Sequence, residues 1–370
     1  MDTLLMIICA VLAICFLVFI HEAGHFLAAR AFGVRVTELM LGLPGPGVGF
    51  TRGGTRYGVT VVLLGGYARV CGMEAGEMSP HLKEVLAALY RRGTATMEDI
   101  AADCGISDDA VYDALEELTE WGSCSGPTKK DEFNTYRASA FSPTKRQLKA
   151  AQAVGATPPE SYELGEARPV ADPQALFDSE YAQQYRALPF WKRSVILLAG
   201  VAVNLLFAML AFIVIYSVIG VDLQYPETGE VFHYNADPLL SVQLGVNYII
   251  ATVQAVAGLF NPATAAETVS NSASIVGIVA MSGGFFSQGL AESLFFMALI
   301  SVSLGIMNLL PIPPLDGGRF VVEVFQKLTR KMVSMKAMGY MSMAGMALFI
   351  VFFAVMLNQD IQRILTGFWS

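Results

Sequence analysis

Residues 3–31 read TLLMIICAVLAICFLVFIHEAGHFLAARA, an apolar run whose last third carries histidine and glutamate. A hydrocarbon core about 30 Å thick needs about 20 mainly apolar residues of helix to cross it, so this run can form a transmembrane helix. It starts after Asp2 rather than after a basic segment, and it ends without a small-residue cleavage site. We therefore interpret it as a retained helix and not as a secretory signal.

The polar end of this run contains His21-Glu22-Ala23-Gly24-His25, an HExxH pattern. Residues four apart share one face of a helix, so both imidazoles can reach one ion while Glu22 approaches a water beside it. Nitrogen ligands at this spacing suit zinc. The same sequence pattern could also arise from two polar residues that cap a helix end, or by chance. The apolar surroundings favour the metal interpretation, because ionisable groups are costly inside a membrane and mark functional sites.

The whole chain has a membrane-protein composition, since 54% of its 370 residues are apolar and only 15% are charged. Three further runs are long and apolar enough to cross a bilayer, at 194–220, 290–311 and 337–357. Polar residues interrupt the run at 239–260, which we expect to be an interfacial helix. The predicted fold is an α-helical polytopic membrane protein with four transmembrane helices.

Lysine and arginine predict the orientation of these spans, because basic residues gather on the cytoplasmic side. Basic residues follow the first span, precede the second and separate the third from the fourth: Arg30, Arg35, Lys192, Arg193, Arg319, Lys327, Arg330, Lys331 and Lys336. Both termini and the acidic connection at 222–237 are then expected on the outer side. The net charge of −8 gives no reason to expect a nucleic-acid partner.

A catalytic zinc site usually has three protein ligands, so the two histidines need a partner from elsewhere. Asp316 is the candidate, in the segment Asn308-Leu-Leu-Pro-Ile-Pro-Pro-Leu-Asp316-Gly317-Gly318. Three prolines end the third span here, and the glycines let the backbone turn again. A plain surface turn would account for this segment in isolation. Asp316 and the two histidines are, however, all expected at the cytoplasmic ends of their spans.

These motifs together resemble the site-2 protease family of intramembrane zinc metalloproteases. The likeness rests on the HExxH helix, the NxxPxPxLDG segment and, between them, Leu41-Gly42-Leu43-Pro44-Gly45-Pro46, Thr55-Arg56-Tyr57 and Gly65-Gly66-Tyr67. It covers residues 1–75 and 186–358. It implies a bacterial cytoplasmic-membrane enzyme that takes part in regulated intramembrane proteolysis, with membrane proteins that have transmembrane helices as substrates.

The resemblance also implies roles for single residues. His21, His25 and Asp316 match the zinc ligands, and Glu22 matches the general base. Asn308 matches an asparagine that helps to hold the substrate backbone. The family pattern Gly-Pro-x-x-Asn reads Gly-Val-Ala-Val-Asn at 200–204, and the missing proline leaves the role of Asn204 undecided.

A β-hairpin is expected before the insert. Residues 57–64 alternate in a strand pattern and are followed by Gly65 and Gly66, which we take as substrate-binding positions. The resemblance implies that this hairpin dips into the membrane near the zinc. Its free edge could pair with an unwound substrate, although a hairpin that only packs against the helices would have the same sequence. Residues 1–72 then form the first domain.

A soluble insert at 73–141 differs in composition, with helices expected at 80–92, 96–103 and 108–121. The order resembles a winged helix-turn-helix domain. Its last helix carries only acidic charges, at Asp108, Asp109, Asp113, Glu116, Glu117 and Glu120. Such a helix repels phosphate, so we expect a protein partner and no nucleic acid. Residues 142–190 are expected to be a linker, and residues 191–370 carry the last three spans.

The sequence leaves two other functions open. One is a metal-binding or transport protein that uses His21, His25 and Asp316 as a passage site. The other is a membrane-tethered regulator with a vestigial metal site. Glu22 argues against a carrier, because a passage site needs no base beside its first ligand.

The connection at 221–238 is too short for the PDZ domain that many relatives carry there.

Overall fold

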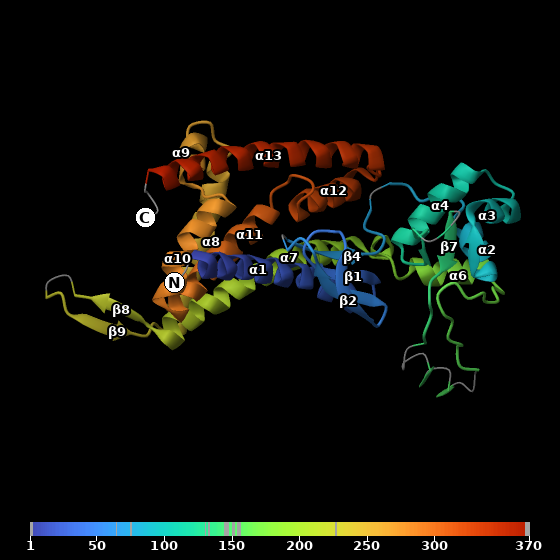
Figure 1. The fold of residues 1–370 in the computed structure, drawn as a ribbon, viewed down its shortest axis with the longest axis horizontal. Helices are drawn as coiled ribbons and strands as arrows, with labels where there is room; N and C mark the ends of the chain where they lie inside the picture. Colours follow the sequence, from blue (N-terminus) through green and yellow to red (C-terminus); the bar gives the residue numbers. More distant parts are fainter. Residues whose placement is uncertain are drawn as a thin grey trace. The chain divides into compact units, whose positions relative to one another are not determined.

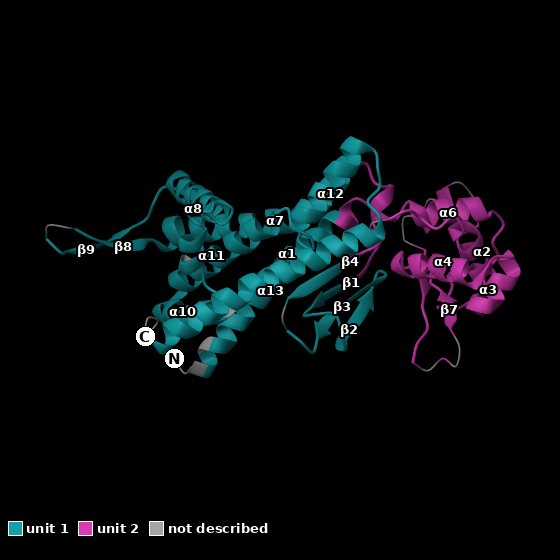
Figure 2. Ribbon diagram, turned by 90° about the horizontal axis from the view of Figure 1, so that it is seen from above, with its two compact units in different colours: residues 1–28, 38–68, 190–370 teal, residues 29–37, 69–189 magenta. Residues whose placement is uncertain are grey.

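The computed structural model describes residues 3–63, 65–74, 76–129, 131, 134–143, 148–149, 152–153, 157–225 and 228–366. The chain divides into two compact units, which Figure 2 colours separately. The first unit comprises residues 1–28, 38–68 and 190–370. The second comprises residues 29–37 and 69–189.

Long apolar helices make up most of the first unit (Figure 1). They are α1 (Thr3–Ala31), α7 (Phe190–Ile213) with its π-helical continuation η2 (Val214–Ile219), α8 (Pro238–Gly258), α11 (Leu290–Asn308) and α13 (Met335–Leu365). Five described helices are long and apolar enough to cross a membrane: Ile7–Ala31, Phe190–Ile219, Pro238–Gly258, Leu290–Asn308 and Met335–Leu365. Four coincide with the predicted spans. The fifth is α8, which we predicted to be interfacial.

Helix α7 packs antiparallel against both α1 and α11. A Cβ atom at Gly24 would lie 2.7 Å from the Ala199 carbonyl oxygen, so only glycine lets α1 approach α7 this closely. The rings of Phe16 and Phe207 meet edge to face about two turns of α1 before Gly24. Further along α7, Ala208, Ala211 and Phe212 share a buried cluster with α11, to which that helix contributes Ala298, Val302 and Ile306. The HExxH helix and the helix that precedes Asp316 thus have α7 as a common neighbour.

Shorter elements complete the first unit: the hairpin strands β8 (Val221–Gln224) and β9 (Val231–Tyr234), and the helices α9 (Ala265–Asn271), α10 (Ile275–Gln288) and α12 (Asp316–Thr329). Buried Asp360 of α13 accepts hydrogen bonds from the main-chain N–H groups of Ser274 and Gly277, where α10 begins. Arg193 of α7 and Glu323 of α12 form an ion pair at 2.9 Å. Polar contacts therefore hold α10 and α12 to the long helices.

A four-stranded sheet follows α1, with the order β2-β3-β1-β4. Its strands are β1 (Val36–Leu41), β2 (Gly47–Arg52), β3 (Thr55–Thr60) and β4 (Gly66–Val70). Strands β2 and β3 form an antiparallel hairpin, and β3 also pairs in parallel with β1. Our prediction of a free edge on the strand at 57–64 is therefore wrong, because β3 has a neighbour on both sides. The edges of the sheet are β2 and β4, and Leu64 lies outside the described residues.

The second unit contains helices close to those predicted. Its elements are α2 (Leu82–Arg92), β5 (Thr94–Thr96), α3 (Met97–Cys104), α4 (Asp108–Glu120), β6 (Cys124–Ser125), β7 (Thr135–Ala138), α6 (Pro173–Tyr181) and the 3-10 turn η1 (Tyr185–Ala187). The strands form one antiparallel sheet with the order β5-β7-β6. A capping box begins α3: the side chains of Thr96 and Asp99 each accept a hydrogen bond from the other residue's main-chain N–H.

The core of the second unit lies between its helices and this sheet. Leu86, Leu89, Ile100, Leu115 and Trp121 are among its fully buried side chains. Helix α6, within the segment that we expected to be a linker, packs Leu176 and Phe177 against the same core.

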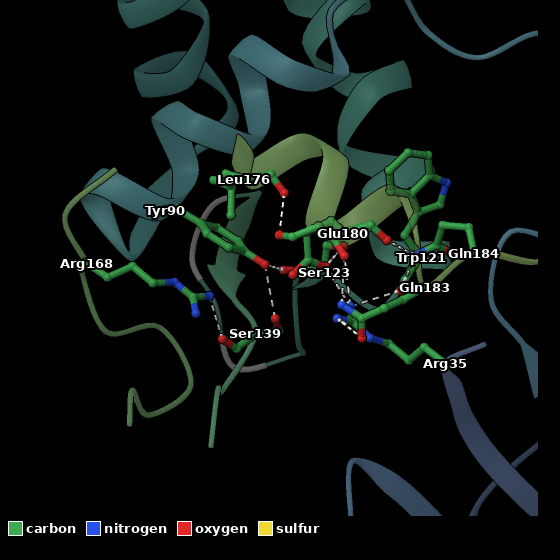
Figure 3. A network of polar contacts seen from close by, with 11 residues as sticks. Arg35, Tyr90, Trp121, Ser123, Ser139, Arg168, Leu176, Glu180, Gln183 and Gln184 are labelled. Atoms are coloured by element: carbon green, nitrogen blue, oxygen red, sulfur yellow. Dashed lines mark hydrogen bonds and ion pairs between the residues drawn. The ribbon is translucent and has the colours of Figure 1, made fainter. Parts of the chain in front are cut away.

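A buried polar network crosses the second unit (Figure 3). The carboxylate of Glu180, which is 8% exposed, accepts hydrogen bonds from Arg35 at 2.8 Å and from Ser123 at 2.6 Å. Arg35 also donates to Gln183 and to the Trp121 carbonyl. Arg35 comes four residues after the end of α1, so the network ties α6 to the segment between the HExxH helix and β1.

Candidate metal centre

Three side chains that could hold a metal converge in the first unit. His21 and His25 lie one turn apart on α1, and Asp316 is the first residue of α12. The Asp316 Oδ2 atom is 3.0 Å from His21 Nε2 and 3.1 Å from His25 Nε2, and the two Nε2 atoms are 3.3 Å apart. Among the residues that the structure describes, these three form the group suited to an ion.

The spacing of these atoms fits a zinc ion. Tetrahedral ligand atoms about 2.1 Å from zinc lie about 3.4 Å from one another, close to the three separations found here. Two imidazoles and one carboxylate supply three corners of the tetrahedron and leave the fourth open, as in catalytic zinc sites. Both imidazoles are buried, which limits competition from bulk water.

Close backbone packing explains how Asp316 reaches the histidines of α1. A Cβ atom at Gly317 would lie 2.2 Å from the Leu309 carbonyl oxygen, and one at Gly318 would lie 2.3 Å from the Pro313 nitrogen. No side chain fits at either position. The two glycines therefore let the start of α12 fold back against the end of α11, which brings the Asp316 carboxylate to the imidazoles.

Helix α7 packs directly behind the two imidazoles. His25 Nδ1 donates to the Ile196 carbonyl at 2.8 Å, and the side-chain amide of Asn204 lies 3.3 Å from His21 Nδ1. Gly200 lies between Ile196 and Asn204 on α7, and a Cβ atom at Gly200 would lie 2.4 Å from His25 Nε2. Residues 196, 200 and 204 are spaced at four, so they share one face of the helix. The contacts of Ile196 and Gly200 with the imidazoles could not be predicted from the sequence, since nothing local indicates which face of α7 meets α1.

Glu22 lies beside the metal candidates and contacts the edge strand β4. One oxygen of its carboxylate accepts a hydrogen bond from the Ala68 N–H at 3.0 Å. A Cβ atom at Gly66 would lie 3.4 Å from Glu22 Cγ, so this glycine is in contact with the glutamate. Gly65 has a φ of +94° and its carbonyl accepts from the Gly42 N–H. Gly65 thus turns the backbone into β4, and Gly66 leaves room for Glu22.

Asn308, the remaining residue of interest, lies in the last turn of α11. Its side-chain amide donates to the Leu304 carbonyl of the same helix at 3.0 Å. The structure therefore brings His21, Glu22, His25, Asp316 and Gly66 together, whereas the Asn308 amide bonds to its own helix.

Comparison with known proteins adds independent information. The model of a family described as peptidase family M50 matches residues 9–352. A Campylobacter jejuni protein is 26% identical over 96% of this chain and 93% of its own length. A Chlamydia trachomatis protein is 32% identical over 40% of this chain, and a Streptococcus pyogenes protein is 36% identical over 23%. These two matches span only 23% and 20% of the relatives' lengths. All three relatives carry the provisional name zinc metalloprotease.

Proposed function

Because the chain belongs to peptidase family M50, the zinc-dependent site-2 proteases of membranes, we propose that it hydrolyses peptide bonds in or near transmembrane segments of membrane proteins. Such cleavage would serve regulated intramembrane proteolysis. The observation that carries the proposal is the meeting of His21, His25 and Asp316 at zinc-ligand spacing beside Glu22. An ion held near the ends of apolar helices can act on peptide bonds at membrane depth.

The site geometry supports a topology with four crossings: α1, α7, α11 and α13. Helices α1 and α11 both bring their C-terminal parts to the metal candidates, so they run in the same direction. If α8 also crossed the membrane, α11 would have to run in the direction opposite to α1. Helix α10 cannot compensate, because its 14 residues span about 21 Å and a bilayer core needs about 30 Å. In this topology α8 is interfacial, both termini lie on the outer side of the bacterial cytoplasmic membrane, and the insert is cytoplasmic.

Each residue of the site has a defined task in the proposed hydrolysis of the peptide bond. His21, His25 and Asp316 would hold the zinc ion, which when bound would supply Lewis acidity toward the peptide carbonyl and the attacking water. Glu22 moves the proton: its carboxylate takes a proton from the attacking water and delivers it to the leaving amide nitrogen. The Ala68 N–H fixes one carboxylate oxygen during these steps. A carrier would have no use for this fixed base.

The edge strand β4 is the surface where we propose that the substrate binds. A helical substrate hides its scissile bond in its own hydrogen bonds, so it must be unwound and held extended. An extended segment can add to a sheet edge through main-chain hydrogen bonds. Strand β4 is an edge of its sheet, and the Cβ position of Gly66 at its start is in contact with Glu22 Cγ, so a segment added to this edge would lie beside the proposed base. Asn308 then bonds the substrate backbone after leaving the Leu304 carbonyl.

The element order of the second unit supports a winged-helix-like fold for the insert: three helices interleaved with an antiparallel sheet of three short strands. Its α4 carries exposed Asp109, Asp113 and Glu116 and no basic residue. A negative recognition helix repels nucleic-acid phosphates. We therefore assign the insert a protein partner.

Zinc analysis combined with a cleavage assay tests the proposed function. We expect one zinc per wild-type chain and cleavage of a helical membrane substrate in liposomes. Asp316→Ala should lose most of its zinc and its activity, because it removes one of three ligands. Asp222→Ala, which removes an exposed carboxylate of β8, is the matched control and should change neither. Wild-type protein that binds no zinc under non-chelating conditions would overturn the proposal.

A further inference from the structure

Asn204 on α7 is completely buried, and only one of the two polar atoms of its side-chain amide has a contact within hydrogen-bond distance. Its Nδ2 atom lies 3.3 Å from His21 Nδ1, while its Oδ1 atom has no hydrogen-bond partner among the residues that the structure describes. Leaving a buried polar atom unpaired costs free energy, so each such atom in a folded protein calls for an explanation. Here the explanation lies in the protonation of the neighbouring imidazole.

An amide that points Nδ2 at His21 conflicts with zinc binding by this histidine. If Nδ2 donates to His21 Nδ1, the ring proton must be on Nε2, the atom that faces Asp316 and His25. A protonated Nε2 has no lone pair for a metal. The oxygen and nitrogen of an asparagine amide have nearly the same shape, so a half-turn of the amide costs no space.

Turning the amide resolves both problems together. Oδ1 then faces His21 Nδ1 and accepts its N–H, which gives the unpaired oxygen a partner. The proton of the ring now sits on Nδ1, so the Nε2 lone pair points at the other two ligand atoms. Metal-ligating histidines characteristically donate their second N–H to an oxygen, which fixes both tautomer and ring orientation.

The second histidine already has this arrangement. His25 Nδ1 lies 2.8 Å from the Ile196 carbonyl, which can only accept, so a neutral His25 ring has its proton on Nδ1 and the lone pair on Nε2, the atom that faces Asp316. Ile196 and Asn204 are eight residues apart, on the same face of α7 as Gly200. One helix face thus offers an oxygen to each imidazole, with a glycine between them where the imidazoles come closest.

Contacts from α11 hold Asn204 in this position. Its main-chain carbonyl accepts a hydrogen bond from Ser301 at 2.9 Å, and a Cβ atom at Gly305 would lie 3.5 Å from Asn204 Cβ. The amide is therefore restricted to the neighbourhood of His21.

We propose that Asn204 is a positioning residue of the zinc site, whose Oδ1 accepts the Nδ1–H of His21 and so presents Nε2 to the metal. This inference rests on the proposed zinc site and adds to it a residue outside the ligand set.

Zinc affinity of the purified full-length protein tests the inference without reference to activity. The dissociation constant is measured by competition with a chromophoric chelator for wild type, Asn204→Leu, Asn204→Asp and Ser194→Ala. Asn204→Leu removes the acceptor and should weaken zinc binding by about 10 to 100-fold. Asn204→Asp keeps an acceptor and should bind zinc as tightly as wild type or more tightly. Ser194, whose hydroxyl bonds to its own helix α7, is the control and should bind as wild type does.

Comparison of Asn204→Asp, which keeps an acceptor, with Asn204→Leu, which removes it, separates positioning from a merely structural role. If Asn204 only filled space, a buried carboxylate would harm the site at least as much as leucine. Equal loss of affinity in Asn204→Asp and Asn204→Leu would therefore overturn the inference, as would wild-type affinity in Asn204→Leu. Wild-type protein without zinc would overturn the proposed function, and the inference would fall with it.

Discussion

The Glu22 carboxylate accepts a hydrogen bond from the Ala68 N–H at 3.0 Å, across 46 residues of sequence. This bond joins the HExxH helix to β4, the edge strand of the neighbouring sheet. Because the N–H belongs to the main chain, substitution of the Ala68 side chain leaves it in place. The proposed base and the proposed substrate edge are therefore held in a fixed relation to each other.

Gly66 should be needed for this relation. Its Cβ position would lie 3.1 Å from the Met40 carbonyl oxygen and 3.4 Å from Glu22 Cγ, so Gly66→Val must push the glutamate aside. A displacement of about 1 Å can cost about 100-fold in rate, and we expect such a fall in kcat with zinc content unchanged. Gly339→Val on α13, where a Cβ meets open space, is the control. Normal kcat in Gly66→Val would show that Glu22 tolerates the crowding.

Arg35 should be essential to the stability of the second unit. Arg35→Ala leaves the buried Glu180 carboxylate with Ser123 but without its cation. Removing one partner of a buried ion pair costs about 3–5 kcal/mol. We expect a large fall in the urea midpoint of the second unit, measured by pulse proteolysis of the full-length protein. Arg92→Ala breaks an exposed pair with Asp103 and should change the midpoint little. Equal midpoints for the two variants would contradict the role of the network.

Glu120 should make the second unit less stable as pH rises. Burial and the neighbouring Glu74 raise the pKa of Glu120 to about 8, and Glu117 adds to the effect while Arg186 opposes it. The folded unit therefore holds a proton that an unfolded glutamate, with a pKa of 4.5, gives up. Between these values the folded state binds more protons, so its stability decreases with rising pH.

Glu120→Gln removes this proton uptake. Its urea midpoint, again from pulse proteolysis, should exceed that of wild type at pH 8 and depend less on pH between 5 and 8. A variant with the same pH dependence as wild type would show that Glu120 is charged in the folded unit at neutral pH.

Local sequence signals predicted the long helices and the candidate ligands. Apolar length indicated α1, α7, α11 and α13, since crossing a bilayer requires it. The spacing of His21 and His25 follows from the helical repeat. Asp316 could be assigned to the same site as the two histidines, because basic residues orient the spans and so predict which helix ends lie at the same depth.

Contacts that depend on pairing between distant segments could not be predicted. The parallel pairing of β1 with β3, which removes the free edge of the strand at 57–64, has no local signature. A main-chain N–H such as that of Ala68 leaves no mark in the sequence. Asn204 and Gly200 matter only because their face of α7 meets α1, and the mostly apolar sequence of α7 does not distinguish that face from the others.

Cleavage of a helical membrane substrate by Glu22→Gln is the most direct test of the proposed role of Glu22 as the base. The variant keeps the size of the side chain and removes the base, and Glu22 is assigned no contact with the metal. We expect cleavage to fall by about 100 to 10,000-fold, with zinc retained and uncleaved substrate co-purifying. Cleavage by Glu22→Gln at the wild-type rate would contradict the proposed mechanism.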